Sequence, residues 1–332
     1  MNTPEILQAF ARLKALVIGD ICLDRWCTYD PGASEPSRET GISRLGVVSA
    51  EVTPGAGGTV ASNLAALGAG QVEVIGVRGD DGFGFELEQA LAARGIATGR
   101  MVKVQDWQTF TYTKLLNSRT GKEDQPRVDF ISNRPLHADS EQSVIENILL
   151  AVPMFDVIVI ADQAETSAGG VVTPAVRDSL SRLAEKYPQK IFLADSRKRV
   201  HLFRKLIMKP NREEAEAACQ GLFGKVDFPA LQRHLDAEVL MVTHGPRGAV
   251  VIQNGEESWA ETRPAEHPID ICGAGDSFAA ACALTLAATR NPVAAARLGN
   301  VAASITIMKR GTGTASAQEI LAAEQNLPAR NP

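Results

Sequence analysis

The sequence predicts an α/β protein in which helices cover both faces of a doubly wound, mostly parallel sheet. Residues 15–20 form a short apolar run with a glycine near its end, which is typical of a first strand buried on both faces. With 332 residues, 45% of them hydrophobic, the chain can bury a large core, and we expect one domain over 1–332. Farther along, strand-like and helix-like segments alternate, at 156–161, 173–187, 190–195, 206–209 and 212–219.

The other expected elements continue this pattern. Asn254 and Gly255 separate two strand-like runs and favour the type I′ turn of a hairpin. Small apolar residues after residue 276 predict long buried helices. The expected strands are 72–77, 238–243, 249–253 and 258–261, and the expected helices are 1–13, a segment ending near 94, 277–288, 292–308 and 317–324.

Two strand-like patches interrupt the α/β pattern, at about 26–53 and 107–132. The first contains an alternating apolar and polar run at 46–52, which is typical of an exposed antiparallel strand. The second contains strand-like runs on either side of the turn-rich segment 117–126. We expect these patches to form a small β lid outside the main sheet, and its exposed strands could also pair two copies into a homodimer.

Composition favours a small-molecule partner in a reducing compartment. The 34 basic and 39 acidic residues give a net charge of −5, and no Lys/Arg stripe with interleaved aromatic residues suggests nucleic-acid binding. Five cysteines without C-x-x-C spacing suggest neither a disulfide framework nor a zinc site. The N-terminus lacks the apolar core of a signal peptide, and the longest apolar run, 278–288, is too short to cross a bilayer. We expect a cytoplasmic protein without nucleic-acid or membrane partners.

The segment Asp-Ile-Cys-Gly-Ala-Gly-Asp at 270–276 is the strongest candidate for chemistry. Gly273, Ala274 and Gly275 lead into an apolar helix, whose free N–H groups and dipole would attract an anion. Asp276 in the first turn would lie beside that anion as an ionised base, which suggests phosphoryl transfer. The alternative is a glycine turn with an acidic first-turn residue, which is common at helix starts.

Polar residues at strand ends and a glycine-rich turn are candidates for substrate binding. Asp24 and Asp162 each follow a strand whose carboxyl end would face the ligand-binding edge, although Asp24 could equally be a solvated loop acid. Gly57 and Gly58 begin an alanine-rich helix that carries Asn63, and would let a ligand approach the backbone. Close helix packing explains the alanines of this helix without explaining the glycines before it.

Two further motifs are candidates for a nucleotide and its metal. Asn211 and Glu214 lie three residues apart after Pro210, where they could hold Mg²⁺ through its waters or simply form a capping box. The strand-end turn that contains Thr243, Gly245 and Gly248 allows a flat backbone approach. No P-loop and no strand-linked dinucleotide fingerprint occur, which disfavours a P-loop NTPase and a Rossmann oxidoreductase.

Together these motifs resemble the ribokinase-like family of PfkB-type carbohydrate kinases over about residues 15–314. The family's closing signature Asp-Thr-x-Gly-Ala-Gly-Asp is matched at 270–276 with Ile271 in place of threonine. Its Asn-x-x-Glu motif is matched at 211–214, and its early aspartate by Asp24. Within the family, the chain is most similar to the heptose 7-phosphate kinases, at 17–26, 113–114, 127–130 and 309–314. It departs from the family's usual helix entry at 55–59 and from this subgroup's lid segment at 37–42.

The resemblance implies an ATP-dependent sugar kinase that uses Mg²⁺ and, as in many members, a monovalent cation such as K⁺ beside the anion loop. Asp276 would be the base, and the N–H groups of 273–276 would stabilise the transferring phosphoryl group. The substrate could be a heptose 7-phosphate, ribose, fructose or a nucleoside; a non-catalytic sugar or nucleotide sensor on the same fold is the alternative. The implied sugar ligands are Asp24, Gly57, Gly58, Asn63 and Asp162, and the implied nucleotide and metal ligands are Asn211, Glu214, Thr243, Gly245, Gly248 and Asn300.

Overall fold

The computed structural model describes residues 1–166, 169–262 and 265–325. Its main sheet has the strand order β14-β13-β12-β11-β10-β9-β1-β4. Neighbouring strands pair in parallel from β4 to β12, and β13 and β14 are antiparallel additions at one edge. The strands are β1 (Lys14–Gly19), β4 (Gln71–Ile75), β9 (Val157–Asp162), β10 (Ile191–Ser196), β11 (Ile207–Met208), β12 (Val239–Thr243), β13 (Ala249–Gln253) and β14 (Glu256–Ala260).

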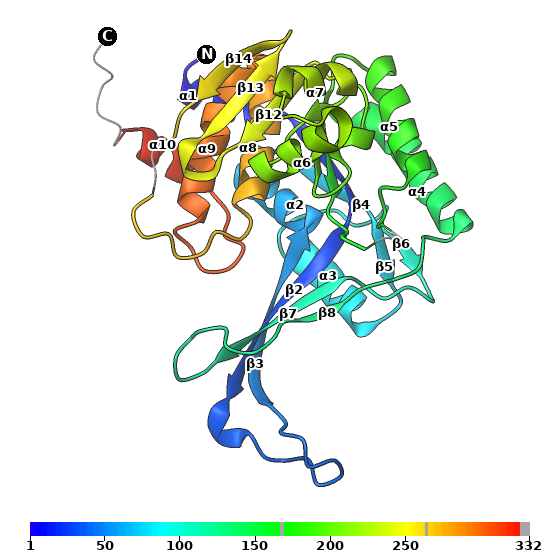
Figure 1. Ribbon diagram of the computed structural model, residues 1–332, viewed down its shortest axis with the longest axis vertical. Coiled ribbons are helices and arrows are strands. Elements are labelled where there is room, and N and C mark those ends of the chain that lie inside the picture. The colour runs from blue at the N-terminus through cyan, green and yellow to red at the C-terminus, as the bar shows by residue number, and fades with distance from the viewer. Residues whose placement is uncertain (167–168, 263–264, 326–332) are drawn as a thin grey trace.

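Helices cover both faces of this sheet, as the sequence predicts (Figure 1). Side chains of one strand alternate between two cores: Val17 packs on one face, and Leu16 and Ile18 pack on the other. The first core is shared with α1 (Thr3–Phe10), α2 (Gly57–Ala66), α3 (Gly82–Ala92), α8 (Ala274–Thr289), α9 (Pro292–Thr306) and α10 (Ala317–Gln325). The second is shared with α4 (Ala138–Ala151), α5 (Pro174–Lys186), α6 (Arg212–Phe223) and α7 (Phe228–Leu235).

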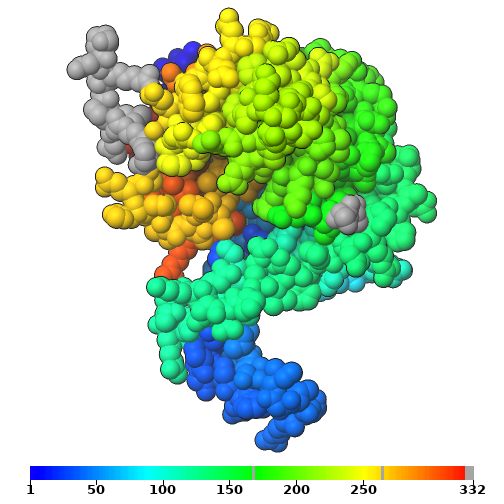
Figure 2. Space-filling model, viewed as in Figure 1, coloured from blue at the N-terminus to red at the C-terminus, as the bar shows by residue number. Residues whose placement is uncertain are grey.

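The lid is a separate sheet that projects from the main body (Figure 2). Its strands lie in the order β3-β2-β7-β8, and they are β2 (Ile21–Asp30), β3 (Gly46–Ala56), β7 (Thr111–Asn117) and β8 (Val128–Phe130). The lid begins at Ile21, earlier than predicted, and only Asp20 separates its first strand from the end of β1 at Gly19. Pairing of two copies through the lid stays a prediction.

The structure confirms several local predictions and corrects others. Asn254 and Gly255 both have positive φ, 54° and 80°, as a type I′ turn requires. The strand predicted at 72–77 is divided, because β5 (Val77–Gly79) leaves the main sheet and pairs with β6 (Val102–Val104). Helices α4 and α7 were not predicted. Within the described residues, no helix is long and apolar enough to span a membrane.

Candidate active site

A cavity of about 440 Å³ lies where the lid, the start of α8 and the loop after β9 meet. It is enclosed by strands from the lid on one side and by the carboxyl ends of the main-sheet strands on the other, as expected for a doubly wound sheet. Its walls carry both acidic and basic side chains. The lining residues include Asp24, Trp26, Ala56, Thr59, Lys114, Arg127, Asp129, Gln163, Glu165, Arg197, Cys272, Gly273 and Asp276.

The segment 270–276 forms the predicted anion loop. Gly273 is the N-cap of α8 with φ 78°, a left-handed conformation that favours glycine. Asp270 fixes the loop because its carboxylate accepts hydrogen bonds from the N–H groups of Cys272 and Gly311, at 2.9 and 3.2 Å. No side chain caps the helix, and the N–H of Ala274 donates to the carbonyl of Ile271 at 3.3 Å. Within the described part of the chain, the N–H groups of Gly275 and Asp276 therefore stay free for an anion.

Asp276 lies in the first turn of α8 and lines the cavity. Burial, and after it the nearby Asp195 carboxylate, raise its pKa, Lys209 and Arg197 oppose the rise, and the net pKa is about 7. A carboxylate with a pKa near neutrality can accept a proton and still be ionised for much of the time at neutral pH. The side chain is therefore suited to act as a general base at the mouth of the anion loop.

Asp24 faces the same cavity from the lid. The sequence places it on a loop after the first strand, but it lies within β2, where it is paired with Thr53 and Tyr112. A Cβ at Gly55 would lie 2.5 Å from Asp24 Oδ1, so this glycine makes room for the carboxylate. Burial raises the pKa of Asp24 to about 6, and the cations Lys114, Arg127 and Arg197 oppose the rise.

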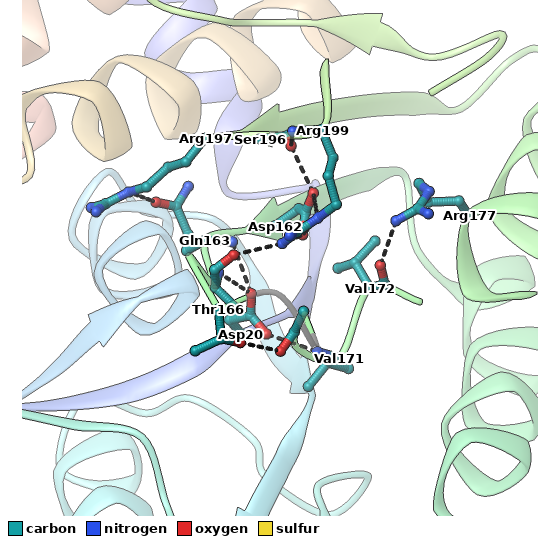
Figure 3. A network of polar contacts seen from close by, with 12 residues as sticks. Asp20, Asp162, Gln163, Thr166, Val171, Val172, Arg177, Ser196, Arg197 and Arg199 are labelled. Atoms are coloured by element: carbon teal, nitrogen blue, oxygen red, sulfur yellow. Dashed lines mark hydrogen bonds and ion pairs between the residues drawn. The ribbon is translucent and has the colours of Figure 1, made fainter. Parts of the chain in front are cut away.

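Asp162 is not among the residues that line the cavity and belongs to a network of polar contacts (Figure 3), so its assignment as a sugar ligand stays a prediction. It is fully buried, and Arg199 donates to it from Nε and from Nη2, the latter at 2.6 Å. Ser196 donates a further hydrogen bond at 2.6 Å. Because Arg199 also donates to the carbonyl of Ala164 at 2.7 Å, the Asp162 cluster supports the cavity wall from behind.

Asp20 supports the same wall and was not predicted (Figure 3). Its buried carboxylate accepts hydrogen bonds from the backbone N–H groups of Gln163, Ala164 and Val171, each at 2.8 Å. Burial raises its pKa to about 6, Asp162 adds to the rise, and the three N–H groups oppose it. The signal in the sequence is a carboxylate directly after the glycine of a buried strand.

The glycine-rich start of α2 also lies behind the cavity rather than on its wall. A Cβ at Gly57 would lie 2.7 Å from Ile21 Cδ1, and one at Gly58 would lie 2.6 Å from Pro54 Cβ. Asn63 is fully buried and accepts a hydrogen bond from the N–H of Ala315 at 3.4 Å. The absence of a side chain at both glycines serves close packing, and Ala56 and Thr59 line the cavity. The assignment of Gly57, Gly58 and Asn63 as sugar ligands stays a prediction.

Asn211 and Glu214 form the capping box that the sequence left open as an alternative. Each side chain accepts a hydrogen bond from the other residue's N–H, at 2.9 Å to Asn211 Oδ1 and 2.7 Å to Glu214 Oε2. Burial and, to a lesser extent, the Asp195 carboxylate raise the pKa of Glu214 to about 7. Asn211 also pairs with Thr243 in a parallel bridge, so the structure brings two of the predicted nucleotide-binding motifs together.

A buried ion pair lies between Glu214 and Asp276. Lys209 Nζ is 2.9 Å from Asp195 Oδ2, and the same Nζ lies 3.6 Å from the position that a Cβ on Gly275 would take. This ion pair acts electrostatically on Glu214 and on Asp276, since Asp195 raises and Lys209 lowers the pKa of each. Within the described residues, no group of three or more His, Cys, Asp or Glu side chains could hold a metal ion directly.

The remaining predicted nucleotide ligands differ in their surroundings. After β12, Gly245 begins a short 3-10 helix (Gly245–Arg247) and Gly248 follows it, and both have positive φ, 57° and 95°. Gly248 packs against the carbonyl of Ala260, which leaves no room for a side chain. Asn300 is buried on α9 and donates to the same Ala260 carbonyl at 2.7 Å. Its amide N–H₂ group therefore joins α9 to β14, and the placement of Asn300 beside the nucleotide stays a prediction.

The cations of the cavity were not predicted as ligands. Arg127 forms a two-bond ion pair with Asp129, with both N···O distances 2.7 Å, and Arg197 pairs with Glu165 at 2.6 Å. Arg197 also donates to Gln163 at 2.6 Å. Lys114 lies beside the anion loop. In the sequence, Lys114 and Arg127 lie in the lid segments and Arg197 follows a strand end. Such positions could indicate a binding site, but sequence spacing alone does not distinguish these cations from solvated surface charges.

Comparisons with known proteins agree on the class of protein to which this chain is similar. The model of the pfkB family carbohydrate kinases matches residues 15–319. The protein is 31% identical over 327 residues to the bifunctional protein HldE of Trichlorobacter lovleyi, and the aligned region covers 96% of this chain and 64% of that protein. It is 30% identical over 332 residues to HldE of Pelobacter propionicus, and this alignment covers 97% of the chain and 66% of that relative. The chain thus spans about two thirds of the length of these relatives.

Solved structures show the same fold at lower identity. Ribokinase from Thermotoga maritima superposes with a TM-score of 0.70 at 20% identity, covering 95% of this chain and 100% of that one. Phosphofructokinase-2 from Escherichia coli in complex with potassium has a TM-score of 0.71 at 19% identity, covering 94% and 98%. These similarities confirm the predicted ribokinase-like architecture.

Proposed function

The chain belongs to the pfkB family of carbohydrate kinases, and from this premise we propose that it transfers the γ-phosphate of ATP to a hydroxyl of a phosphorylated sugar. A heptose 7-phosphate is the first candidate, because the similarity to HldE proteins covers nearly the whole chain. The observation that carries the proposal is the shared cavity: Asp276, the free N–H groups of α8 and the basic side chains of the lid all border it.

In the proposed transfer, each group that borders the cavity has a separate role. Asp276 takes the proton of the acceptor hydroxyl as its oxygen attacks the γ-phosphorus, and Asp24 orients the sugar by accepting hydrogen bonds from other hydroxyls. The N–H groups at the start of α8 stabilise charge on the transferring group. Arg127 and Arg197 supply positive charge for the phosphate that the sugar already carries.

The surroundings of Glu214 fit a hydrated Mg²⁺ rather than a directly ligated one. The Asp195 carboxylate adds to the rise in the pKa of Glu214 that burial mainly causes, so two acidic groups act on one another here, and Mg²⁺ retains several of its waters beside such groups. When bound, the ion would neutralise charge on the nucleotide phosphates. Asn211 and Glu214 would hold its waters, and Thr243, Gly245 and Gly248 would border the nucleotide. A monovalent cation near the carbonyls of Ile271 and Cys272 stays part of the proposal.

A coupled ADP-release screen tests the proposed function. The panel contains heptose phosphates, hexose phosphates, hexoses, ribose and nucleosides, each with ATP and Mg²⁺. We expect turnover with a phosphorylated sugar and at least tenfold lower kcat/KM, about 1.4 kcal/mol in transition-state stabilisation, for the matching free sugar. ATP binding without turnover on the whole panel would contradict the proposal and favour a sugar or nucleotide sensor.

The pH dependence of kcat/KM tests the assignment of the base. Because the pKa of Asp276 is raised to about 7, we expect kcat/KM to fall about tenfold per pH unit below about pH 7. Below about pH 6 the fall in kcat/KM should steepen toward about a hundredfold per pH unit, because Asp24, with a pKa of about 6, also becomes protonated. Circular dichroism over the same range controls for unfolding. A rate that stays constant from about pH 8 to about pH 5.5 would contradict an ionised Asp276 in the mechanism.

A further inference from the structure

Lys114 reaches from the lid to the anion loop. It lies on β7 and its Nζ donates a hydrogen bond to Cys272 Sγ at 3.4 Å. Cys272 directly precedes Gly273, the N-cap of α8. A cation that belongs to the lid therefore lies next to the N–H groups that would bind the transferring phosphoryl group.

The other basic side chains of the cavity are already engaged by carboxylates. Arg127 pairs with Asp129, Arg197 with Glu165, and Arg25 with Glu86 at 3.4 Å. Among the described residues, the carboxylate oxygen nearest to Lys114 Nζ is Oε2 of Glu123, at 4.0 Å. The Lys114 ammonium group thus has donors left for an anion, and its side chain is only 20% exposed.

The surrounding side chains fix the direction of Lys114. Its Nζ lies 4.3 Å from the ring centroid of Trp26, a cation–π contact with the neighbouring strand β2. The loop after α9 lies close to the ring of Trp26, since a Cβ added at Gly311 would be 3.3 Å from the ring atom Cζ2. The N–H of Gly311 binds Asp270 of the anion loop. Lid, anion loop and Lys114 therefore form one connected cluster.

We propose that Lys114 is a catalytic residue that the lid delivers to the transferring phosphoryl group. This inference rests on the proposed function. As the acceptor oxygen forms its bond to phosphorus, the bond between phosphorus and the bridging oxygen of ATP breaks, and ADP leaves with the electron pair. The acceptor's proton goes to Asp276, and Lys114 keeps its own protons throughout. Its charge offsets the negative charge that is shared among the equatorial phosphoryl oxygens during transfer.

Lys114→Met tests this role because methionine keeps the length of the side chain and removes the charge. We expect kcat to fall about 10²- to 10³-fold, the effect of losing one preorganised donor, while the KM of the sugar changes less than about threefold. Lys114→Arg should recover part of kcat, since it restores a cation. Lys122→Met is the matched control: Lys122 is an exposed lysine of the same lid, and its loss should leave kcat and KM unchanged.

The remaining outcomes overturn the inference. If Lys114→Met raises the KM of the phosphorylated sugar and leaves kcat unchanged, Lys114 binds the phosphate that the substrate already carries. If neither parameter changes, the cluster serves lid packing alone. A thermal midpoint close to that of the wild type would exclude misfolding of the Met variant, and Lys114→Gln provides a second neutral variant should it misfold. Failure of the wild type in the ADP-release screen would instead remove the proposed function, and with it the premise.

Discussion

Replacing Asp276 by asparagine is expected to lower kcat by roughly 10²- to 10⁴-fold with the true substrate. Asparagine retains the shape of the side chain and cannot accept the proton of the acceptor hydroxyl. The free N–H groups of α8 and the cavity stay in place, so the KM values of ATP and sugar should change much less than kcat. Steady-state kinetics with the substrate found in the screen measures both.

Stability provides the control for this variant. The pKa of Asp276 rises from its ordinary value of 3.8 to about 7 in the folded protein, so its ionised form opposes folding above about pH 7. At about pH 8, Asp276→Asn should raise the free energy of unfolding by about 1–3 kcal/mol. This gain should disappear as the pH falls from about 7 to about 4, where the native carboxyl is protonated. An unchanged kcat would remove Asp276 from the mechanism.

The architecture could be predicted because its signals are local. Buried parallel strands form apolar runs, the type I′ turn needs Asn254 and Gly255, and the anion loop needs Gly273 at positive φ. Helix α4 had a usable signal as well: Val144, Ile148 and Ala151 are buried at spacings of four and three residues. That spacing occurs in a polar segment, where it is easily overlooked.

The candidate site was only partly predictable, because tertiary packing decides which polar groups remain available. A strand-end aspartate binds a ligand or a neighbouring cation with equal ease, and the sequence does not place Arg199 beside Asp162. The same holds for glycines at a helix start, since Gly58 makes room for Pro54. Lys114 meets Cys272 across 158 residues of chain, a contact that no local pattern indicates.

Asp162 provides the largest expected effect on stability. Its side chain is fully buried, and the partly buried Arg199 donates to it together with Ser196. Asp162→Ala leaves the Arg199 charge without its carboxylate, so we expect the free energy of unfolding to fall by about 3–5 kcal/mol. Urea denaturation at neutral pH measures this change. Arg199→Met combined with Asp162→Ala should recover part of the loss, because no buried charge is then left unpaired.

The outcome also decides between the two roles of Asp162. Were it a sugar ligand, its loss would raise the KM of the sugar and leave the urea midpoint unchanged. A supporting residue behaves in the opposite way: the midpoint falls, and the double variant regains both stability and sugar affinity, although neither substituted side chain can bind a hydroxyl. Glu165→Gln is the matched control, since Glu165 pairs with Arg197 at an exposed position and its loss should change the free energy of unfolding by less than about 1 kcal/mol.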